Sequence, residues 1–367
     1  MRTAQQARRV LLLTSHPVEA RDGADKELAL TVAAGMPDVD FTWFGQAGRR
    51  GREPLRTGRR VPLLSATGMP GVAERVQAAG LGLALDARVD LVHAVVTIGP
   101  WFGKFVALRE RVLGPHRRPA IHTVPAVADP RWLRGAAALG TTVALSRATQ
   151  SQLQDAGFPD VRLVPPGTDL GRWPLQARRH AGPPVVAFAG HYDVEGGLSE
   201  SVAALGALAR TGTAVRALFL MRPRPGQDEA GEAAALLRRA RAAGLEDVRV
   251  HGRVPDMPAV VADVDVLLLP ARDLGGKADV PLTLLEAMAT GRPVVVSDLP
   301  ELAALGGAVT RVPVGDVPAL TAAVRGLLDE PARWQARSRA GRALVEQRFS
   351  AAEMVGRYRG LYDELLG

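Results

Sequence analysis

The sequence predicts an α/β protein built from two Rossmann-like domains, whose mostly parallel sheets face a central cleft. Short β-rich apolar runs alternate with helical patterns along the whole chain, which is typical of stacked βαβ units. The 367 residues exceed one ordinary core and fit two domains of common size. Each half also begins with a strand that runs into a glycine-bearing loop.

The expected elements form two series, separated by a polar, arginine-rich stretch at residues 171–184. In the first series we expect strands at 9–14, 39–44, 90–96, 119–124, 141–145 and 161–164, and helices at 25–34, 70–85, 104–113 and 146–156. In the second we expect strands at 185–189, 215–221, 248–251, 264–269, 293–296 and 308–312, and helices at 198–210, 228–243 and 316–328. The predicted domains are therefore residues 1–175, with a last helix at 351–367 packing back on them, and residues 180–350.

The composition excludes several classes of protein. No apolar run reaches the ~20 residues that a membrane span needs, and the chain has no cysteine for a disulfide, a zinc site or a thiol nucleophile. The apolar run at 10–13 is too short for the core of a signal peptide. We therefore expect a soluble, cytoplasmic protein.

The net charge of +8 favours a phosphorylated ligand, an anionic lipid surface or DNA. Only 4% of the residues are aromatic, and no helix-turn-helix or zinc-finger spacing occurs, so we expect no nucleic-acid partner. Six arginines crowd one expected loop: Arg49, Arg50, Arg52, Arg56, Arg59 and Arg60. We expect either a solvated loop there or a contact with a phosphorylated acceptor or an anionic membrane, which would place the protein at the inner face of that membrane.

The most informative stretch is ADVPLTLLEAMA at 278–289, followed by TGRPVVVSD. Pro281 suits the first turn of a helix, Gly291 suits its end, and residues 293–296 read as a buried strand. Glu286 is then a carboxylate in an apolar helix, and buried carboxylates are uncommon without a partner. A ribose diol would be such a partner. The helix start comprises Val280, Pro281, Leu282 and Thr283, and its free N–H groups, which Pro281 lacks, should face a phosphate.

With its surroundings, this stretch resembles the retaining glycosyltransferases of the GT-B fold, in particular the glycogen-synthase-like group called family 4, or glycosyl transferases group 1. The resemblance covers nearly the whole chain. It is carried further by DLVH at 90–93, ALS at 144–146, VRLVPPGTD at 161–169 and the region 248–270. It implies a nucleoside-diphosphate sugar as donor, departure of the diphosphate with attack on the same face, no cofactor and no obligatory metal.

In that family a Glu at the position of Glu286 holds the donor ribose, and a Glu eight residues earlier contacts the transferred sugar. Here the earlier position is Ala278, so we expect its neighbour Asp279 to reach the sugar hydroxyls, unless that contact is lost.

The family also places an Arg and a Lys in the loop that follows the first strand of the second domain, here beginning at Gly190. His191 stands at the usual Arg and Gly196 at the usual Lys. A departing diphosphate needs positive charge or oriented N–H dipoles. We expect Lys277 and Arg222 to substitute for the missing pair.

In the first domain, Asp22, Gly23 and Asp25 resemble the family's glycine-rich loop on the acceptor side, where Gly23 would let the backbone approach the diphosphate. His122, expected at a strand end, matches a family position where His contacts the reacting sugar. The alternative for His122 is a hydrogen-bonded core or rim residue.

Two other functions stay open at this point: a nucleotide-sugar-binding protein that has lost catalysis, and a sugar-nucleotide epimerase. Asp263-Val264-Asp265 spells the Asp-x-Asp of metal-dependent transferases, but it begins an apolar strand, so we expect no metal there. The sequence does not choose the base, the sugar or the oligomeric state. The acceptor also stays open, with a phosphorylated and a lipid-linked compound as the alternatives.

Overall fold

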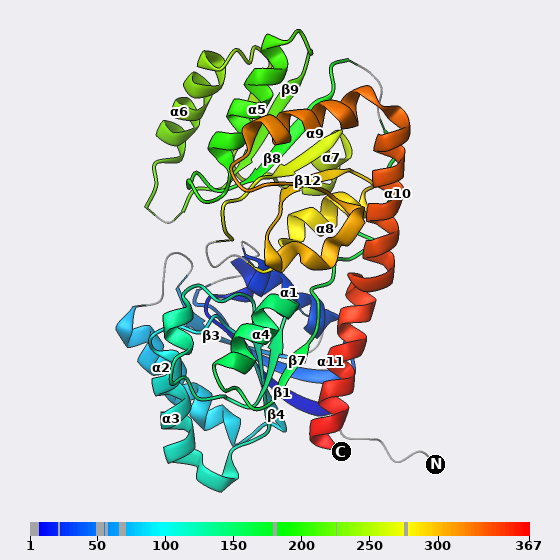
Figure 1. Cartoon of the computed structure of the whole chain (residues 1–367). Coiled ribbons are helices and arrows are strands. Elements are labelled where there is room, and N and C mark those ends of the chain that lie inside the picture. The colour runs from blue at the N-terminus through cyan, green and yellow to red at the C-terminus, as the bar shows by residue number, and fades with distance from the viewer. Residues whose placement is uncertain are drawn as a thin grey trace. The chain divides into compact units, whose positions relative to one another are not determined.

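A computed structural model of the chain describes residues 7–20, 23–48, 55, 58–65, 71–178, 182–224, 226–274 and 278–367 (Figure 1). The chain divides into two compact units. Unit 1 contains Met1–Gly167, Gly276–Val280 and Ala351–Gly367, and unit 2 contains Thr168–Gly275 and Pro281–Ser350. Compared with the expected domains, residues 168–175 lie in unit 2 and the short segment Gly276–Val280 lies in unit 1.

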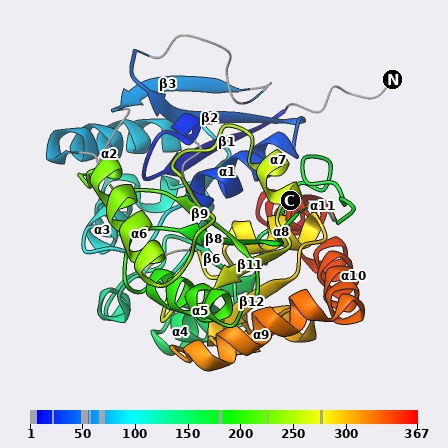
Figure 2. The same ribbon diagram turned by 90° about the horizontal axis from the view of Figure 1, so that it is seen from above.

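Unit 1 is built on a seven-stranded sheet of order β3-β2-β1-β4-β5-β6-β7, in which every neighbouring pair is parallel. Figure 2 shows β1, β2 and β3 side by side at one edge. The strands are β1 (Arg8–Thr14), β2 (Val39–Gln46), β3 (Arg59–Leu64), β4 (Leu91–Val95), β5 (Ala120–Val124), β6 (Thr141–Ala144) and β7 (Val161–Leu163). The helices are α1 (Ala24–Ala34), α2 (Val72–Asp86), α3 (Phe102–Leu113), α4 (Arg147–Asp155) and α11 (Ala351–Leu366).

Alternate residues of β1 supply the two faces of this sheet, because successive side chains of a strand point to opposite sides. Val10 and Leu12 join the core that α1 and α11 cover, whereas Leu11 joins the core beneath α3 and α4. The sheet is therefore buried on both faces, as parallel sheets are.

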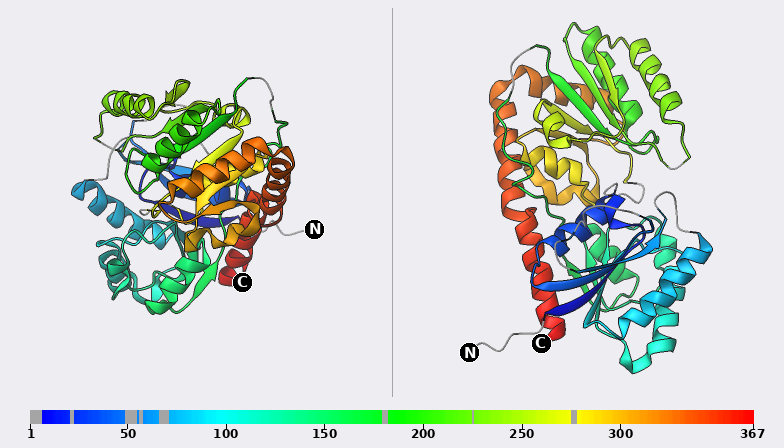
Figure 3. Two further views of the ribbon diagram at one scale, coloured as in Figure 1. Left: turned by 45° about the horizontal axis from the view of Figure 1, so that its top comes forward. Right: turned by 180° about the vertical axis from the view of Figure 1, so that it is seen from behind.

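The last helix, α11, packs on the sheet of unit 1 although α10 (Pro331–Arg348), just before it in the chain, belongs to unit 2 (Figures 1 and 3). A buried polar network fixes its position. His93 Nδ1 lies 2.9 Å from the Tyr362 hydroxyl and His93 Nε2 lies 2.9 Å from Thr123 Oγ1, which in turn lies 2.8 Å from the Tyr358 hydroxyl. Each of these polar groups has a hydrogen-bond partner, so the network fixes the orientation of α11, which apolar packing alone would not specify.

Unit 2 repeats the design with a six-stranded parallel sheet of order β10-β9-β8-β11-β12-β13. The strands are β8 (Val185–Gly190), β9 (Arg216–Met221), β10 (Val248–His251), β11 (Val266–Leu269), β12 (Val294–Ser297) and β13 (Thr310–Val312). The helices are α5 (Leu198–Arg210), α6 (Glu229–Ala242), α7 (Met257–Ala262), α8 (Leu282–Ala289), α9 (Val317–Asp329) and α10. Helices α5, α6 and α9 cover one face, and α8 packs against β11 and β12.

The structure corrects the expected arginine loop. Arg59 and Arg60 begin β3 and pair in register with Thr42 and Trp43 of β2. The Arg60 guanidinium donates to the carbonyl oxygen of Gln46 at 2.8 Å. Arg49, Arg50, Arg52 and Arg56 lie outside the described residues, so the membrane hypothesis is not tested for them.

Candidate functional site

The carboxyl edge of unit 2 has the geometry of a ligand site. Helical crossovers leave β8 and β11 in opposite directions, since β8 leads to β9 on one side and β11 leads to β12 on the other. Ligands of open parallel sheets bind beyond the carboxyl ends of the strands at such a switch point. The segments that follow β8, β9 and β11 are therefore the elements to inspect.

The loop from β8 to α5 needs glycine at its end. Gly197 has φ +83°, and a Cβ placed on it would lie 2.2 Å from the carbonyl oxygen of Pro270, just beyond β11. The loop backbone therefore passes against the end of β11 more closely than any side chain allows. This close approach brings the start of α5 to the switch point.

The structure brings together two residues that the sequence singled out for the diphosphate. His191 follows β8 and Arg222 follows β9, and Gly190 pairs in register with Met221 immediately before them. Arg222 Nη2 lies 3.0 Å from His191 Nε2, and His191 Nδ1 lies 2.7 Å from the carbonyl oxygen of Arg222. Because a guanidinium only donates, Nε2 accepts and Nδ1 carries the proton.

A second link joins the same two loops. Arg224 Nη2 donates to Asp193 Oδ2 at 2.5 Å, and the N–H of Gly196 donates to Asp193 Oδ1 at 3.0 Å. This ion pair fixes the conformation of the loop at the position where the family carries its Lys.

Helix α8 follows its predicted boundaries closely. It begins at Leu282 after Pro281 and is followed by Thr290 and Gly291, the latter with φ +80°. Leu284, Leu285 and Ala287 are buried, whereas Pro281, Leu282, Thr283 and Glu286 are only half-buried. Glu286 stands one turn after Leu282 and Thr283, so it shares their side of the helix. The first-turn N–H groups, which have no partner within a helix, lie at the N-terminal end of that same side.

The residues just before α8 pack into unit 1. Asp279 is 3% exposed and Val280 is fully buried. The Asp279 N–H donates to the carbonyl oxygen of Pro125 at 3.1 Å, and Pro125 is the first residue beyond β5. Lys277, expected to help with the diphosphate, lies outside the described residues.

His122 does not lie where the sequence placed it. It is the third of five residues in β5, and its side chain is fully buried in the core. Nε2 lies 2.9 Å from the Val96 carbonyl oxygen, and the ring stacks on Phe102 at a centroid distance of 4.3 Å. Burial lowers the pKa of His122 to about 4, so the imidazole is neutral at physiological pH. The residue at the strand end is Pro125, which the sequence analysis missed.

Gly23, just before α1, has backbone angles that any residue adopts, and a side chain there would meet the side chains of Asp25 and Lys26. Gly23 is extended, with φ −157°, but a Cβ there would lie 2.5 Å from Asp25 Oδ1 and 3.1 Å from Lys26 Cε. Asp25 Oδ2 lies 3.4 Å from the Ser15 hydroxyl at the end of β1. Lys26 is 6% exposed, and no sequence signal had distinguished it. Asp22 lies outside the described residues.

The same edge of unit 1 holds a buried carboxylate that sequence reasoning also missed. The Glu19 side chain is fully buried, and neither of its oxygens has a hydrogen-bond partner among the residues that the structure describes. Its ion-pair partner is Arg60, whose Nε lies 3.9 Å from Oε1. A Cβ on Gly45 would lie 2.4 Å from Glu19 Oε1, so this glycine makes the room that the carboxylate occupies.

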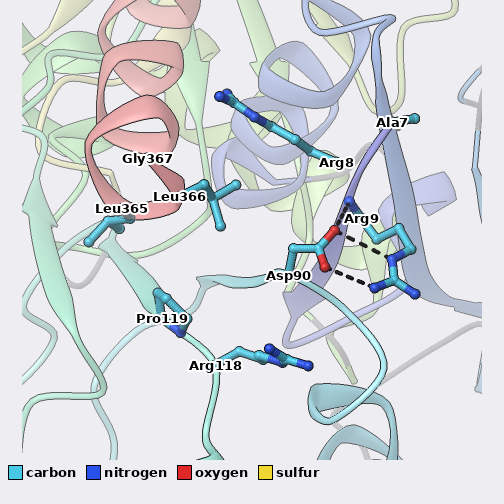
Figure 4. A pocket seen from close by; sticks show the side chains of 9 residues that line it. All are labelled: Ala7, Arg8, Arg9, Asp90, Arg118, Pro119, Leu365, Leu366 and Gly367. Atoms are coloured by element: carbon cyan, nitrogen blue, oxygen red, sulfur yellow. Dashed lines mark hydrogen bonds and ion pairs between the residues drawn. The ribbon is translucent and has the colours of Figure 1, made fainter. Parts of the chain in front are cut away.

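A pocket of about 450 Å³ lies at the opposite, amino-terminal edge of the unit 1 sheet (Figure 4). Arg9 Nη2 donates to Asp90 Oδ1 at 2.9 Å there, and Arg8 pairs with Asp363. Its charged groups are largely paired with one another, and it lies away from the strand ends where ligands of such sheets bind. The remaining lining residues are Ala7, Arg118, Pro119, Leu365, Leu366 and Gly367.

Within the described ranges, no group of three or more His, Asp or Glu residues could hold a metal ion. Asp265 of the Asp-x-Asp sequence is 6% exposed and accepts hydrogen bonds from the Val185 N–H at 2.8 Å and from Arg178 Nε at 2.7 Å. It thus ties β11 to β8. No helix among the residues described is long and apolar enough to cross a membrane.

Comparison with known proteins identifies the class. Sucrose-phosphate synthase from Thermosynechococcus elongatus superimposes with a TM-score of 0.78 at 17% identity, covering 98% of this chain and 99% of that one. HepE of Anabaena, solved with UDP and glucose, gives 0.76 at 16% identity, covering 98% and 100%. The two parallel sheets with their helices thus form the two-domain GT-B fold of glycosyltransferases.

Residues 181–330 match the model of the family described as Glycosyl transferases group 1. Glycogen synthase of Mycobacterium tuberculosis is 30% identical over 208 residues, and 2-deoxystreptamine glucosyltransferase of Streptomyces kanamyceticus is 30% identical over 257. The matches cover 54% and 65% of this chain and span 47% and 63% of those relatives. These matches confirm the inferred resemblance to glycosyl transferases group 1 with the GT-B fold.

Proposed function

We propose that this protein is a retaining glycosyltransferase that moves a sugar from a nucleoside-diphosphate sugar to an acceptor, without an obligatory metal. The observation that carries the proposal is the carboxyl edge of unit 2, where His191, Arg222 and the start of α8 surround the β8/β11 switch point. These groups supply a cation, oriented N–H dipoles and a carboxylate, which are the groups that a ribose and a diphosphate need.

Each of these groups has a distinct role in the proposal. Glu286 accepts hydrogen bonds from the ribose diol, since it stands half-buried on the helix side where the free N–H groups begin. Leu282 and Thr283 present those N–H groups to the phosphates. Asp279, just before the helix, contacts the transferred sugar. Arg222 neutralises the charge that develops on the departing diphosphate.

The acceptor is proposed to bind at the carboxyl edge of unit 1, near Gly23 and Asp25. Gly23 adds no side chain beside Asp25 and Lys26, and the carboxylate of Asp25 provides a hydrogen-bond acceptor for hydroxyl groups. His122 is left out of this site because its ring is fully buried.

The test is a screen of UDP, GDP, ADP and dTDP by thermal shift, followed by the matching nucleotide-sugars with candidate acceptors. A bound ligand raises apparent stability according to its affinity. We expect one diphosphate to raise Tm, and release of that diphosphate to require an acceptor and to persist in EDTA. The NMR coupling of the product's anomeric proton reports retention directly.

Other outcomes would favour the alternatives. Binding without turnover would support a protein that has lost catalysis, as Ala278 and Gly196 at the two family positions would suggest. Accumulation of a free epimerised hexose with the diphosphate would support an epimerase. An inverted anomeric centre would retain the transferase and refute the retaining mechanism.

A further inference from the structure

We propose that His191 and Arg222 form a proton-linked cation pair, in which binding of the donor diphosphate transfers the Arg222 guanidinium to phosphate and adds a proton to His191. This inference rests on the proposed function and concerns how the same site acquires its positive charge. It accounts for a chain that carries His at the position where its family carries Arg.

The placement of the pair follows from the sheet. Gly190 and Met221 are register partners on β8 and β9, so the next residue of each strand emerges at the same edge. The Arg222 N–H donates to the Gly190 carbonyl oxygen at 2.9 Å, which extends the ladder by one bond. Arg222 is exposed and His191 is half-buried, so a ligand at this edge can reach both side chains.

The hydrogen bonds define the protonation state before binding. Nε2 of His191 accepts from the Arg222 guanidinium at 3.0 Å, and Nδ1 donates to the Arg222 carbonyl at 2.7 Å. The imidazole is therefore neutral, with its single proton on Nδ1. When the guanidinium moves to the diphosphate, the Nε2 lone pair becomes free and one proton from water binds to it. The Nδ1–H bond to the carbonyl holds the ring in both states.

The surrounding charges change sign when the ligand binds. Without a ligand, the Arg222 guanidinium lies 3.0 Å from the imidazole and disfavours a second cation there. On its own loop, Asp193 is paired with Arg224. On the neighbouring elements, α6 carries Glu229 and Glu232; burial first, and then the charges of these two residues, raise the pKa of Tyr192 beside His191.

Among the described residues of α5 and of the segment after β11, Glu200 pairs with Arg272. The Arg272 N–H donates to the backbone carbonyl of Glu195, on the same loop as His191. A diphosphate adds two or more negative charges next to the ring, which favours the imidazolium.

The experiment measures proton uptake on binding. Isothermal titration with the diphosphate found in the screen is run at pH 8.0, 7.0 and 6.0 in buffers of different ionisation enthalpy. A single linked proton strengthens binding by up to about tenfold per pH unit on acidification. The His191→Gln variant separates this effect from the titration of the phosphate itself, because the phosphate is the same in both proteins. We expect wild type to take up more protons than the variant, by up to one per ligand.

Two further variants sharpen the comparison. Arg222→Gln removes the charged partner and should weaken diphosphate binding about 10- to 150-fold, with less effect on the free nucleoside. Arg216→Gln is the matched control, since Arg216 lies at the opposite end of β9 with its own ion pair to Asp247. It should retain the proton uptake of wild type.

The outcomes separate the two proposals. Equal proton uptake by wild type and His191→Gln, with a diphosphate bound, would overturn the cation pair and leave the transferase proposal standing. Failure of every nucleoside diphosphate to bind at any pH would overturn both. Loss of uptake in Arg216→Gln as well would show that the effect does not come from the His191–Arg222 pair and would overturn the role of His191.

Discussion

Two buried histidines in unit 1 should make the protein acid-sensitive well above the range in which carboxylates titrate. Burial lowers the pKa of His93 to about 3, with a further contribution from nearby His122, and burial lowers the pKa of His122 itself to about 4. Both side chains are fully buried, so water does not screen the effect. In the unfolded chain each histidine titrates near 6.5.

The sign and the size of the effect follow from linkage. Below pH 6.5 the unfolded chain binds protons that the folded chain does not, so stability is full above pH 6.5 and is lost as the pH falls. At pH 5.0, RT ln(1 + 10^1.5) is about 2 kcal/mol for each histidine, or about 4 kcal/mol for the two. The folded pKa values hardly affect this result, because both lie about a unit or more below pH 5.0.

Urea unfolding, monitored with a probe in unit 1 at pH 7.5 and at pH 5.0, measures the loss of unfolding free energy. His122→Phe fills the same space against Phe102 and removes one of the two groups, so its loss should be about 2 kcal/mol smaller than that of wild type. His116→Gln replaces an exposed histidine of the same unit and serves as the control. The reasoning is refuted if His122→Phe and wild type lose the same stability between the two pH values.

Four further predictions concern the other features. Glu286→Gln should leave urea unfolding unchanged and weaken diphosphate binding about 10- to 150-fold in calorimetry. If the variant binds the diphosphate as tightly as wild type, Glu286 has a structural role instead. Gly197→Ala should lower the free energy of unfolding more than Gly212→Ala does. Both glycines have φ +83°, but only Gly197 has a neighbour within 4 Å of an added Cβ. Equal losses would contradict the close approach to Pro270. Tyr362→Phe should lower the free energy of unfolding by about 1–3 kcal/mol, because it leaves His93 Nδ1 without its partner. It should also speed amide hydrogen exchange in α11, and unchanged exchange would refute the role of the network. Changing the six arginines at positions 49 to 60 to Gln should reduce sedimentation with anionic vesicles at low salt, and equal sedimentation of the two proteins would remove the membrane hypothesis.

Most of the strands could be predicted from the sequence because strands covered on both faces are continuous apolar runs. β3 was missed because it lies at the sheet edge, where RRVPLL combines two arginines with a proline. Pro62 is tolerated there because an edge strand has hydrogen-bonding groups that need no partner strand. The composition of this edge strand is therefore similar to that of a loop.

The site was less predictable because it depends on where each strand ends and on which side chain faces the core. A shift of three residues along β5 separates buried His122 from Pro125 at the edge, and no local pattern marks the end. Glu19 was missed because its burial comes from the way Gly45 and Arg60 approach it in space. Periodicity along one segment carries no information on such contacts between segments.

The pairing of His191 with Arg222 shows why loss of a family cation need not remove the charge. Adjacent strands of a sheet lie about 4.8 Å apart, and their carboxyl ends meet at the same edge. An arginine one residue beyond β9 therefore reaches the residue one position beyond β8, as the 3.0 Å contact with the imidazole demonstrates.

The cation can be supplied from the end of either strand, but the two cases differ in how the charge depends on pH and on the ligand. An arginine in the β8 loop is charged at every physiological pH, whereas a histidine at that position is charged only when a ligand favours it. In the proposed mechanism the second positive charge is thus present while the diphosphate is bound and is lost with the proton when the diphosphate leaves.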